Sequence, residues 1–125
     1  MFIKKKLKFL NEKKGKLLPI SFKNNLKTKI KRIFFISGNL KFPRGNHAHK
    51  KCTQTLIQLI GSSKIELKNK KNKKNFILNE KNNFALTIKP KTWVKINFKS
   101  KKNLIAVLCS HEYDKSDYIY DFNNL

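Results

Sequence analysis

Two of the three histidines in this chain, His47 and His49, lie two positions apart in a segment that also contains Arg44 and Gly45. In an extended backbone, side chains at positions i and i+2 point to the same face, so the two imidazoles converge. Such a pair ligates a metal ion, transfers protons near neutral pH, or packs as a polar cluster. Residues 43–51 are therefore the first candidate for chemistry, with Arg44 as a neighbouring cation.

The sequence around the histidines argues against the metal alternative. Small barrels of the cupin type carry a glycine, an HxH pair, a glutamate three or four residues on and a second glycine after six more. Here Gln54 stands in the place of the acid, Gly61 follows after six residues, and Lys95 stands in the place of a later histidine. Two imidazoles and an amide are a weak ligand set for a transition metal. We therefore predict that the site holds no metal.

The elements that must position these side chains are short strands. Runs of β-branched and aromatic residues separated by turn residues predict strands at 30–37, 52–60, 64–67, 75–78, 84–88, 92–98 and 104–109, after a strand, turn and strand between 7 and 20. Residues 22–25 read as a loop, and the basic run 68–74 as a hairpin loop. No segment has a sustained helical period. The chain is predicted to be all-β, a single domain over 1–125 folded as a small antiparallel β-barrel or jelly roll.

The composition limits the possible partners. A formal net charge of +23 points toward nucleic acid, but the charge is nearly all lysine, whereas phosphate and base contacts favour arginine. The aromatic residues lie mainly at alternating, core-facing positions rather than among the lysines. A solvated lysine surface is favoured, and an RNA-binding basic β-barrel remains an alternative. Two cysteines, no signal peptide and no apolar stretch long enough to span a bilayer predict a cytoplasmic protein without membrane or nucleic-acid partners.

Several motifs carry a resemblance when they are taken together. They are KGKL at 14–17, IKRIFFI at 30–36, PRGNHAHK at 43–50, Gln54 to Gly61, Pro90 with Trp93, AVLCS at 106–110, and the tail with Tyr113-Asp114 and Asp117-Tyr118-Ile119. In this combination the chain resembles the sugar nucleotide 3,4-ketoisomerases, cupins of the WxcM-like or FdtA-like type that act on dTDP-4-keto-6-deoxyglucose. The resemblance covers nearly all 125 residues.

The resemblance implies an isomerase. The keto group would move from C4 to C3 of a dTDP-sugar through an enediol, without metal or redox cofactor, in the synthesis of a 3-amino-3,6-dideoxy sugar. It also implies a homodimer with edge strands paired between the subunits. A 3,5-epimerase-like cupin acting on the same kind of substrate is the alternative enzyme, and the configuration of the product at C4 is left open.

The resemblance also assigns roles to residues. His49 is favoured as the base, His47 as a polarising or relaying group, and Arg44 as the cation that neutralises enediolate or diphosphate charge; a satisfied polar cluster is the alternative for the two histidines. The predicted substrate contacts are Lys14, Arg32, Phe35, Gln54 and Trp93, although a lone tryptophan on a strand more often packs.

Two departures from the family pattern bear on the mechanism. Relatives often carry a tyrosine, with its hydroxyl in the active site, where this chain has Phe34-Phe35. They also commonly have arginine where this chain has Lys14. Tyr118 and Tyr120 are expected to anchor the tail to the barrel or to a partner subunit.

Overall fold

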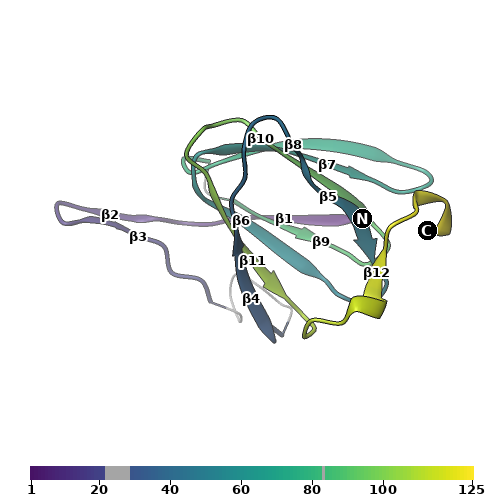
Figure 1. Ribbon diagram of the computed structural model, residues 1–125. Coiled ribbons are helices and arrows are strands. Elements are labelled where there is room, and N and C mark those ends of the chain that lie inside the picture. The colour runs from purple at the N-terminus through teal and green to yellow at the C-terminus, as the bar shows by residue number, and fades with distance from the viewer. Residues whose placement is uncertain (22–28, 83) are drawn as a thin grey trace.

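Two five-stranded antiparallel sheets face each other in the computed structural model, which describes residues 1–21, 29–82 and 84–125 (Figure 1). Sheet 1 has the order β1 (Phe2–Lys6), β9 (Phe84–Ile88), β6 (Gln54–Ile60), β11 (Leu104–Cys109) and β4 (Arg32–Ile36). Sheet 2 has the order β12 (Tyr118–Ile119), β5 (Arg44–His49), β10 (Trp93–Phe98), β7 (Ser62–Lys68) and β8 (Lys73–Asn79). The predicted all-β jelly roll is confirmed. The loop predicted at 22–25 lies outside the described residues.

The main core lies between the two sheets because the strands alternate in period two. In β10, the side chains of Val94, Ile96 and Phe98 are buried and the residues between them are partly exposed. The inward-facing side chains of both sheets form one hydrophobic cluster, which includes Leu56, Ile65, Leu67, Leu86 and Val107. This is the packing expected of two sheets that each bury one face.

A second cluster explains why β11 is apolar on both of its faces. Ile57, Ala85, Ala106 and Leu108 face away from the main core and pack with Leu7. Leu18, Ile20, Ile30 and Leu59 are partly buried against them. The chain segments next to the N-terminal hairpin therefore cover part of the outer face of sheet 1, and β11 is buried throughout except at its first residue, as predicted.

The N-terminal region contains one predicted element and one that was missed. The strand, turn and strand predicted between 7 and 20 is the hairpin of β2 (Leu10–Glu12) and β3 (Gly15–Leu17), which projects away from the two sheets in Figure 1. β1 was not predicted because its lysines are exposed and it lacks a buried face. It joins the edge of sheet 1 by pairing with β9.

The C-terminal segment returns to the histidine strand. After β11 come two short 3₁₀ turns, η1 (Lys115–Asp117) and η2 (Phe122–Asn124), with β12 between them pairing with β5. Among the residues that the structure describes, no helix has the length and apolar character needed to cross a membrane.

Candidate active site

A cavity of about 470 Å³ opens between the two sheets beside the histidine strand. Its lining combines apolar inward-facing side chains with a few polar ones, a composition typical of small-molecule sites. The lining residues are Phe34, Ile36, Pro43, Arg44, Gly45, His47, Gln54, Leu56, Val94, Ile96, Val107, Tyr118 and Tyr120.

A β-bulge in β5 brings Arg44 and His47 to the same cavity. Their separation of three positions would place them on opposite faces of a regular strand. The register between β10 and β5 shifts here: Val94 pairs with His47 and Lys95 pairs with Gly45, so Asn46 has no partner residue on β10. Gly45 and Asn46 both have positive φ, of 88° and 57°, which glycine and asparagine adopt more readily than other residues. Gly45 and Asn46 therefore form the bulge that points the side chains of both Arg44 and His47 into the cavity.

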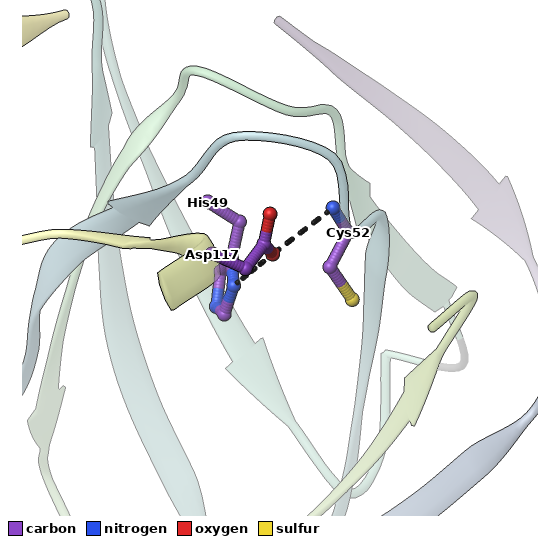
Figure 2. Close-up of side chains that lie close together, drawn as sticks. All are labelled: His49, Cys52 and Asp117. Carbon is purple, nitrogen blue, oxygen red and sulfur yellow. Dashed lines mark hydrogen bonds and ion pairs between the residues drawn. The ribbon is translucent and has the colours of Figure 1, made fainter. Parts of the chain in front are cut away.

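The imidazole of His49 is held by a carboxylate from the C-terminal segment. His49 Nδ1 lies 3.1 Å from Oδ2 of Asp117, and Figure 2 shows the two side chains facing each other. Asp117 also accepts hydrogen bonds from the backbone N–H groups of Lys51, at 2.8 Å, and Cys52, at 3.3 Å. Burial raises the pKa of the Asp117 carboxyl, but these three donors outweigh that effect and hold it below the usual value. Asp117 is therefore an anion that fixes the ring of His49.

The hydrogen bonds determine which nitrogen of each histidine is available for chemistry. A carboxylate only accepts, so in the neutral ring Nδ1 of His49 carries the proton and Nε2 presents a lone pair. That Nε2 is buried and has no hydrogen-bond partner among the described residues. In His47, Nδ1 lies 3.1 Å from the carbonyl oxygen of Gly45, which also only accepts, so its Nε2 is unprotonated in the neutral ring as well. Burial and the neighbouring His49 lower the pKa of His47, which favours the neutral form.

Two tyrosines of the tail complete the polar end of the cavity. The ring centroid of Tyr118 lies 4.4 Å from that of His49 and 5.0 Å from that of His47, and the two imidazoles are 5.1 Å apart. Tyr120 stacks on Tyr118 at 5.7 Å. His49 itself is only 5 % exposed and lies behind the residues that line the cavity. The sequence predicted that both tyrosines anchor the tail, and it gave Asp117 no role in the site, although Asp117 belongs to the tail motif that carries the family resemblance.

Arg32 and two thiols lie at the base of this polar cluster. Arg32 Nη2 lies 3.5 Å from Cys109 Sγ, and Gln54 Nε2 lies 3.7 Å from the same sulfur. A hydrogen bond with Cys109 is the main reason that the pKa of Cys52 is lowered to about 5, and the same bond raises the pKa of Cys109. Both cysteines are free and buried.

His49, Cys52 and Asp117 also have the composition of a metal site, with ligand atoms within 4.8 Å of one another (Figure 2). Their hydrogen bonds provide a different explanation for the cluster. Both oxygens of Asp117 already accept from N–H groups, and Nδ1 of His49 is one of these donors, so its lone pair is not free for an ion. We interpret the cluster as a hydrogen-bond network that positions His49.

The structure also changes the assignment of the later cupin segment. Lys95 lies on the outer face of β10 near Glu66, with its Nζ 4.0 Å from Oε2 of that residue. Val94, one position earlier, lines the cavity instead. The sequence predicted Lys95 at the place of the later cupin histidine, which is one residue too late. The sequence does not show which residues of β10 face inward, and in the structure it is Val94 that pairs with His47. An apolar valine at this place also fits a site without a metal.

The predicted substrate contacts divide into two groups. Gln54 lines the cavity. Arg32 lies beside the cavity, with its guanidinium carbon 5.3 Å from the ring centroid of Phe34, which lines the cavity, and over the ring of Tyr113. Phe35, by contrast, is 61 % exposed on the outer face of β4. The prediction that Phe35 contacts substrate was therefore wrong, and Phe34 lines the cavity instead. The alternation of β4 is the reason, since only every second residue faces inward.

Two further predicted contacts lie away from the cavity of their own chain. Trp93 is on the outer face of β10, where its ring packs edge-on against Phe122 at 5.8 Å and Lys68 approaches it. It fixes the C-terminal segment to sheet 2, which is the packing role considered for a lone tryptophan. Lys14 is exposed at the turn of the projecting β2–β3 hairpin.

Comparison with known proteins identifies the family. Residues 3–125 match the FdtA family model, described as WxcM-like, C-terminal. The chain belongs to the FdtA family. A curated relative, the TDP-4-oxo-6-deoxy-α-D-glucose-3,4-oxoisomerase of Aneurinibacillus thermoaerophilus, is 32 % identical over 114 residues, which are 90 % of this chain and 81 % of the relative.

Solved structures of FdtA-type ketoisomerases superpose closely on this chain. A histidine-to-asparagine variant of the 3,4-ketoisomerase QdtA from Thermoanaerobacterium thermosaccharolyticum, in complex with TDP-4-keto-6-deoxyglucose, is 34 % identical with a TM-score of 0.91, and the match covers 98 % of this chain and 89 % of that one. The TDP-quinovose 3,4-ketoisomerase WlaRB of Campylobacter jejuni is 30 % identical with a TM-score of 0.90, covering 98 % of this chain and 95 % of that one.

Proposed function

We propose that this protein is a TDP-4-keto-6-deoxyglucose 3,4-ketoisomerase that moves the keto group from C4 to C3 by histidine-mediated proton transfer. The observation that carries the proposal is the Asp117–His49 pair, which leaves a buried, unprotonated Nε2 beside a cavity that His47 lines. The curated and solved relatives named above support the reaction type and the substrate.

The chemistry begins with a proton on carbon next to a carbonyl. In the 4-keto sugar, His49 Nε2 takes the proton from C3, and the electrons of that bond form an enediolate across C3 and C4. Asp117 stabilises the resulting imidazolium through Nδ1. Transfer of the O3 proton to O4 and delivery of a proton from the imidazolium to C4 leave the carbonyl at C3 and a hydroxyl at C4. His47 polarises the sugar oxygens or relays a proton, and Arg44 at the cavity lining neutralises enediolate or diphosphate charge.

Substrate binding is proposed for Gln54 and Arg32, beside the histidines, with Phe34 as the apolar wall. The 3-keto product is a suitable substrate for an aminotransferase, which would lead to a 3-amino-3,6-dideoxy sugar. We expect no cofactor to take part, because the proton transfers need only a base, an acid and a cation.

A homodimer is part of this proposal. β4 is an edge strand of sheet 1 and exposes Phe35 on its outer face, and the projecting hairpin exposes Leu10 and Leu17. A second copy that packs on these residues would cover both the edge and the apolar side chains. Lys14, at the tip of the hairpin, would then contact substrate only in the cavity of the second copy.

The dimer is tested by sedimentation of the wild type and two variants. We expect the wild type at twice the chain mass and Leu17→Asp shifted toward the monomer. Ile77→Asp is the matched control, because Ile77 is exposed on β8, an edge strand of sheet 2, and this variant should remain dimeric. A wild-type monomer, or a Leu17→Asp variant that dimerises as well as the wild type, would contradict this arrangement.

The reaction is tested by incubating the purified chain with TDP-4-keto-6-deoxyglucose in D₂O and following the sugar by NMR. We expect the 3-keto product, with deuterium confined to C4 of the product and C3 of the remaining substrate, and no product from His49→Asn, which cannot accept the proton. Persistence of the 4-keto sugar with a folded wild-type chain would remove the proposal. Deuterium at C5 would instead indicate a 3,5-epimerase.

A further inference from the structure

Strand β4 brings only apolar side chains, Phe34 and Ile36, to the cavity and no hydroxyl. Phe34 is the residue of β4 that faces the cavity at this position, and it has no group that transfers a proton. Tyr118 brings a phenol into the same cavity from the C-terminal segment, in contact with the rings of both histidines. This raises the question of what the hydroxyl of Tyr118 does.

The fold holds Tyr118 directly opposite the proposed base. In the β12–β5 ladder, Tyr118 is the cross-strand partner of His49, and Ile119 pairs with Ala48. The preceding residue, Asp117, hydrogen-bonds the ring of His49 and accepts a hydrogen bond from the backbone N–H of Lys51. The two side chains are therefore fixed relative to each other by the same short segment. A site needs this rigidity when an acid and a base act on neighbouring atoms of one substrate.

The electrostatic surroundings of Tyr118 suit a proton donor that is briefly ionised. Burial raises the pKa of its phenol, and the nearby Arg32 guanidinium opposes this without cancelling it. The resting residue is therefore a neutral phenol with a proton to give. The Arg32 cation is in place to stabilise the phenolate once the proton has left.

The other polar residues of the cavity suit this task less well. Arg44 is always charged and has no proton to give near neutral pH, and the amide of Gln54 does not ionise. Tyr120 lines the cavity but is 68 % exposed and stacks on the outer side of Tyr118. His47 is the one competitor, since it also faces the cavity with a free Nε2.

We propose that Tyr118 is a further catalytic residue, which carries the oxygen-bound proton between O4 and O3 while His49 carries the carbon-bound proton between C3 and C4. This inference rests on the proposed ketoisomerase function. As the C3–H electrons form the C3–C4 double bond, the carbonyl electrons move to O4, which takes the proton of the Tyr118 hydroxyl. The phenolate then removes the proton of O3, the C3–O3 double bond forms, and C4 takes its proton from the His49 imidazolium. Each bond broken is matched by one formed, and both residues return to their starting states.

The experiment compares Tyr118→Phe, Tyr113→Phe and His49→Asn in two measurements on the full chain; Tyr113 is exposed and does not line the cavity. One is conversion of TDP-4-keto-6-deoxyglucose, and the other is exchange of the C3 proton for deuterium in recovered substrate. For Tyr118→Phe we expect kcat to fall by about 10²-fold to 10³-fold, the range typical of a general acid, with KM and the affinity for TDP within about twofold of wild type. C3 exchange should also fall, because Tyr118 donates to O4 in the step that releases the C3 proton, but by less than conversion, which additionally needs removal of the O3 proton. His49→Asn should lose both, and Tyr113→Phe should lose neither.

The outcomes separate this inference from the function on which it rests. A folded wild-type chain that converts no 4-keto sugar overturns the proposed function and this inference with it. If the wild type is active and Tyr118→Phe keeps kcat within about threefold, the function stands and the role of Tyr118 is refuted. Equal losses of exchange and conversion would also refute it, because Tyr118 would then act only by supporting His49. The same loss of conversion with intact exchange in His47→Asn, but not in Tyr118→Phe, would assign the relay to His47.

Discussion

The proposed function depends most directly on Asp117, so its replacement by asparagine is the most informative substitution. The carboxylate accepts three hydrogen bonds, from His49 Nδ1 and from the backbone N–H groups of Lys51 and Cys52. Asparagine keeps one acceptor oxygen, which can serve Lys51, but its NH₂ group would then face the N–H of Cys52 and the ring of His49. His49 can relieve the conflict only by accepting at Nδ1, which places its proton on Nε2.

This change of tautomer removes the lone pair that takes the C3 proton. We expect kcat of Asp117→Asn to fall by up to about 10⁴-fold, the size of effect found when an aspartate that orients a catalytic histidine becomes asparagine. The hydrogen bond from Cys52 is lost, and the one with His49 no longer involves an ionised group. Because a hydrogen bond to a charged group is worth about 1.5–3 kcal/mol, we expect a lower free energy of unfolding by about 2–4 kcal/mol. For a chain of this length, that lowers Tm by about 3–5 °C per kcal/mol.

The assay combines conversion of the 4-keto sugar by NMR, urea unfolding, and the ¹⁵N chemical shifts of the His49 ring, which report its tautomer. Asp121→Asn is the matched control, because the Asp121 carboxylate accepts a hydrogen bond from Asn123 N–H at an exposed turn. It should keep full activity. A folded Asp117→Asn variant with activity within about threefold of wild type would refute the reasoning.

The pH dependence of stability provides an independent check on the same residue. The pKa of Asp117 is lower in the folded chain than its usual value of 3.8. Its contribution to stability is therefore present above that value and is lost as the pH falls through the folded pKa. The unfolding free energies of wild type and Asp117→Asn should converge as the pH falls below 3.8 and through the folded pKa. Curves that stay parallel down to that pH would show that the carboxylate is not stabilised by its neighbours.

The remaining predictions concern the strands around the site. The pKa of His47 is lowered from 6.5 in the folded chain, so protonation of this imidazole favours the unfolded chain, and the free energy of unfolding should decrease as the pH is lowered from 7 to 5. His47→Asn should make this pH dependence shallower in urea unfolding. Equal pH dependence in wild type and variant would contradict this prediction. Gly45→Ala should cost about 2 kcal/mol or more and reduce activity, because φ is +88° and a Cβ would lie 2.7 Å from the carbonyl oxygen of Val94; near wild-type stability would show that the bulge tolerates a side chain. Ile57→Ala should cost about 2–4 kcal/mol by thermal unfolding, because Ile57 is buried in the cluster outside sheet 1, whereas Ile77→Ala, at an exposed position, should cost less than about 1 kcal/mol; equal effects would rule out that cluster as a packed core.

The strand assignments and the histidine pair follow from local patterns, and these were predictable. Alternation of apolar and polar side chains over 84–88 and 92–98 specified half-buried strands, and the turn residues between strands specified hairpins such as the one that joins β7 and β8. His47 and His49 converge because two positions are one strand period. A strand such as β1 was missed because it is held at a sheet edge by backbone pairing, without a buried side-chain face of its own.

It was harder to predict which residues of a strand face the core than to predict the strand itself. In β4, Phe34 and Ile36 are apolar, and so are Ile33 and Phe35, so the sequence does not say which set faces inward. Packing of sheet 1 against sheet 2 selects Phe34 for the cavity. The same limit explains Lys95, since the inward phase of β10 places Val94 opposite His47.

By itself, then, the sequence determined an all-β chain with two imidazoles on one strand and a resemblance to the ketoisomerases. Only the tertiary structure brought Asp117 to His49 across 68 positions and placed Tyr118 between the two histidines. Local patterns fix the spacing of side chains along one strand, but they do not encode which distant segment pairs with it. The pairing of β12 with β5 made that choice, and with it the charge that orients the base.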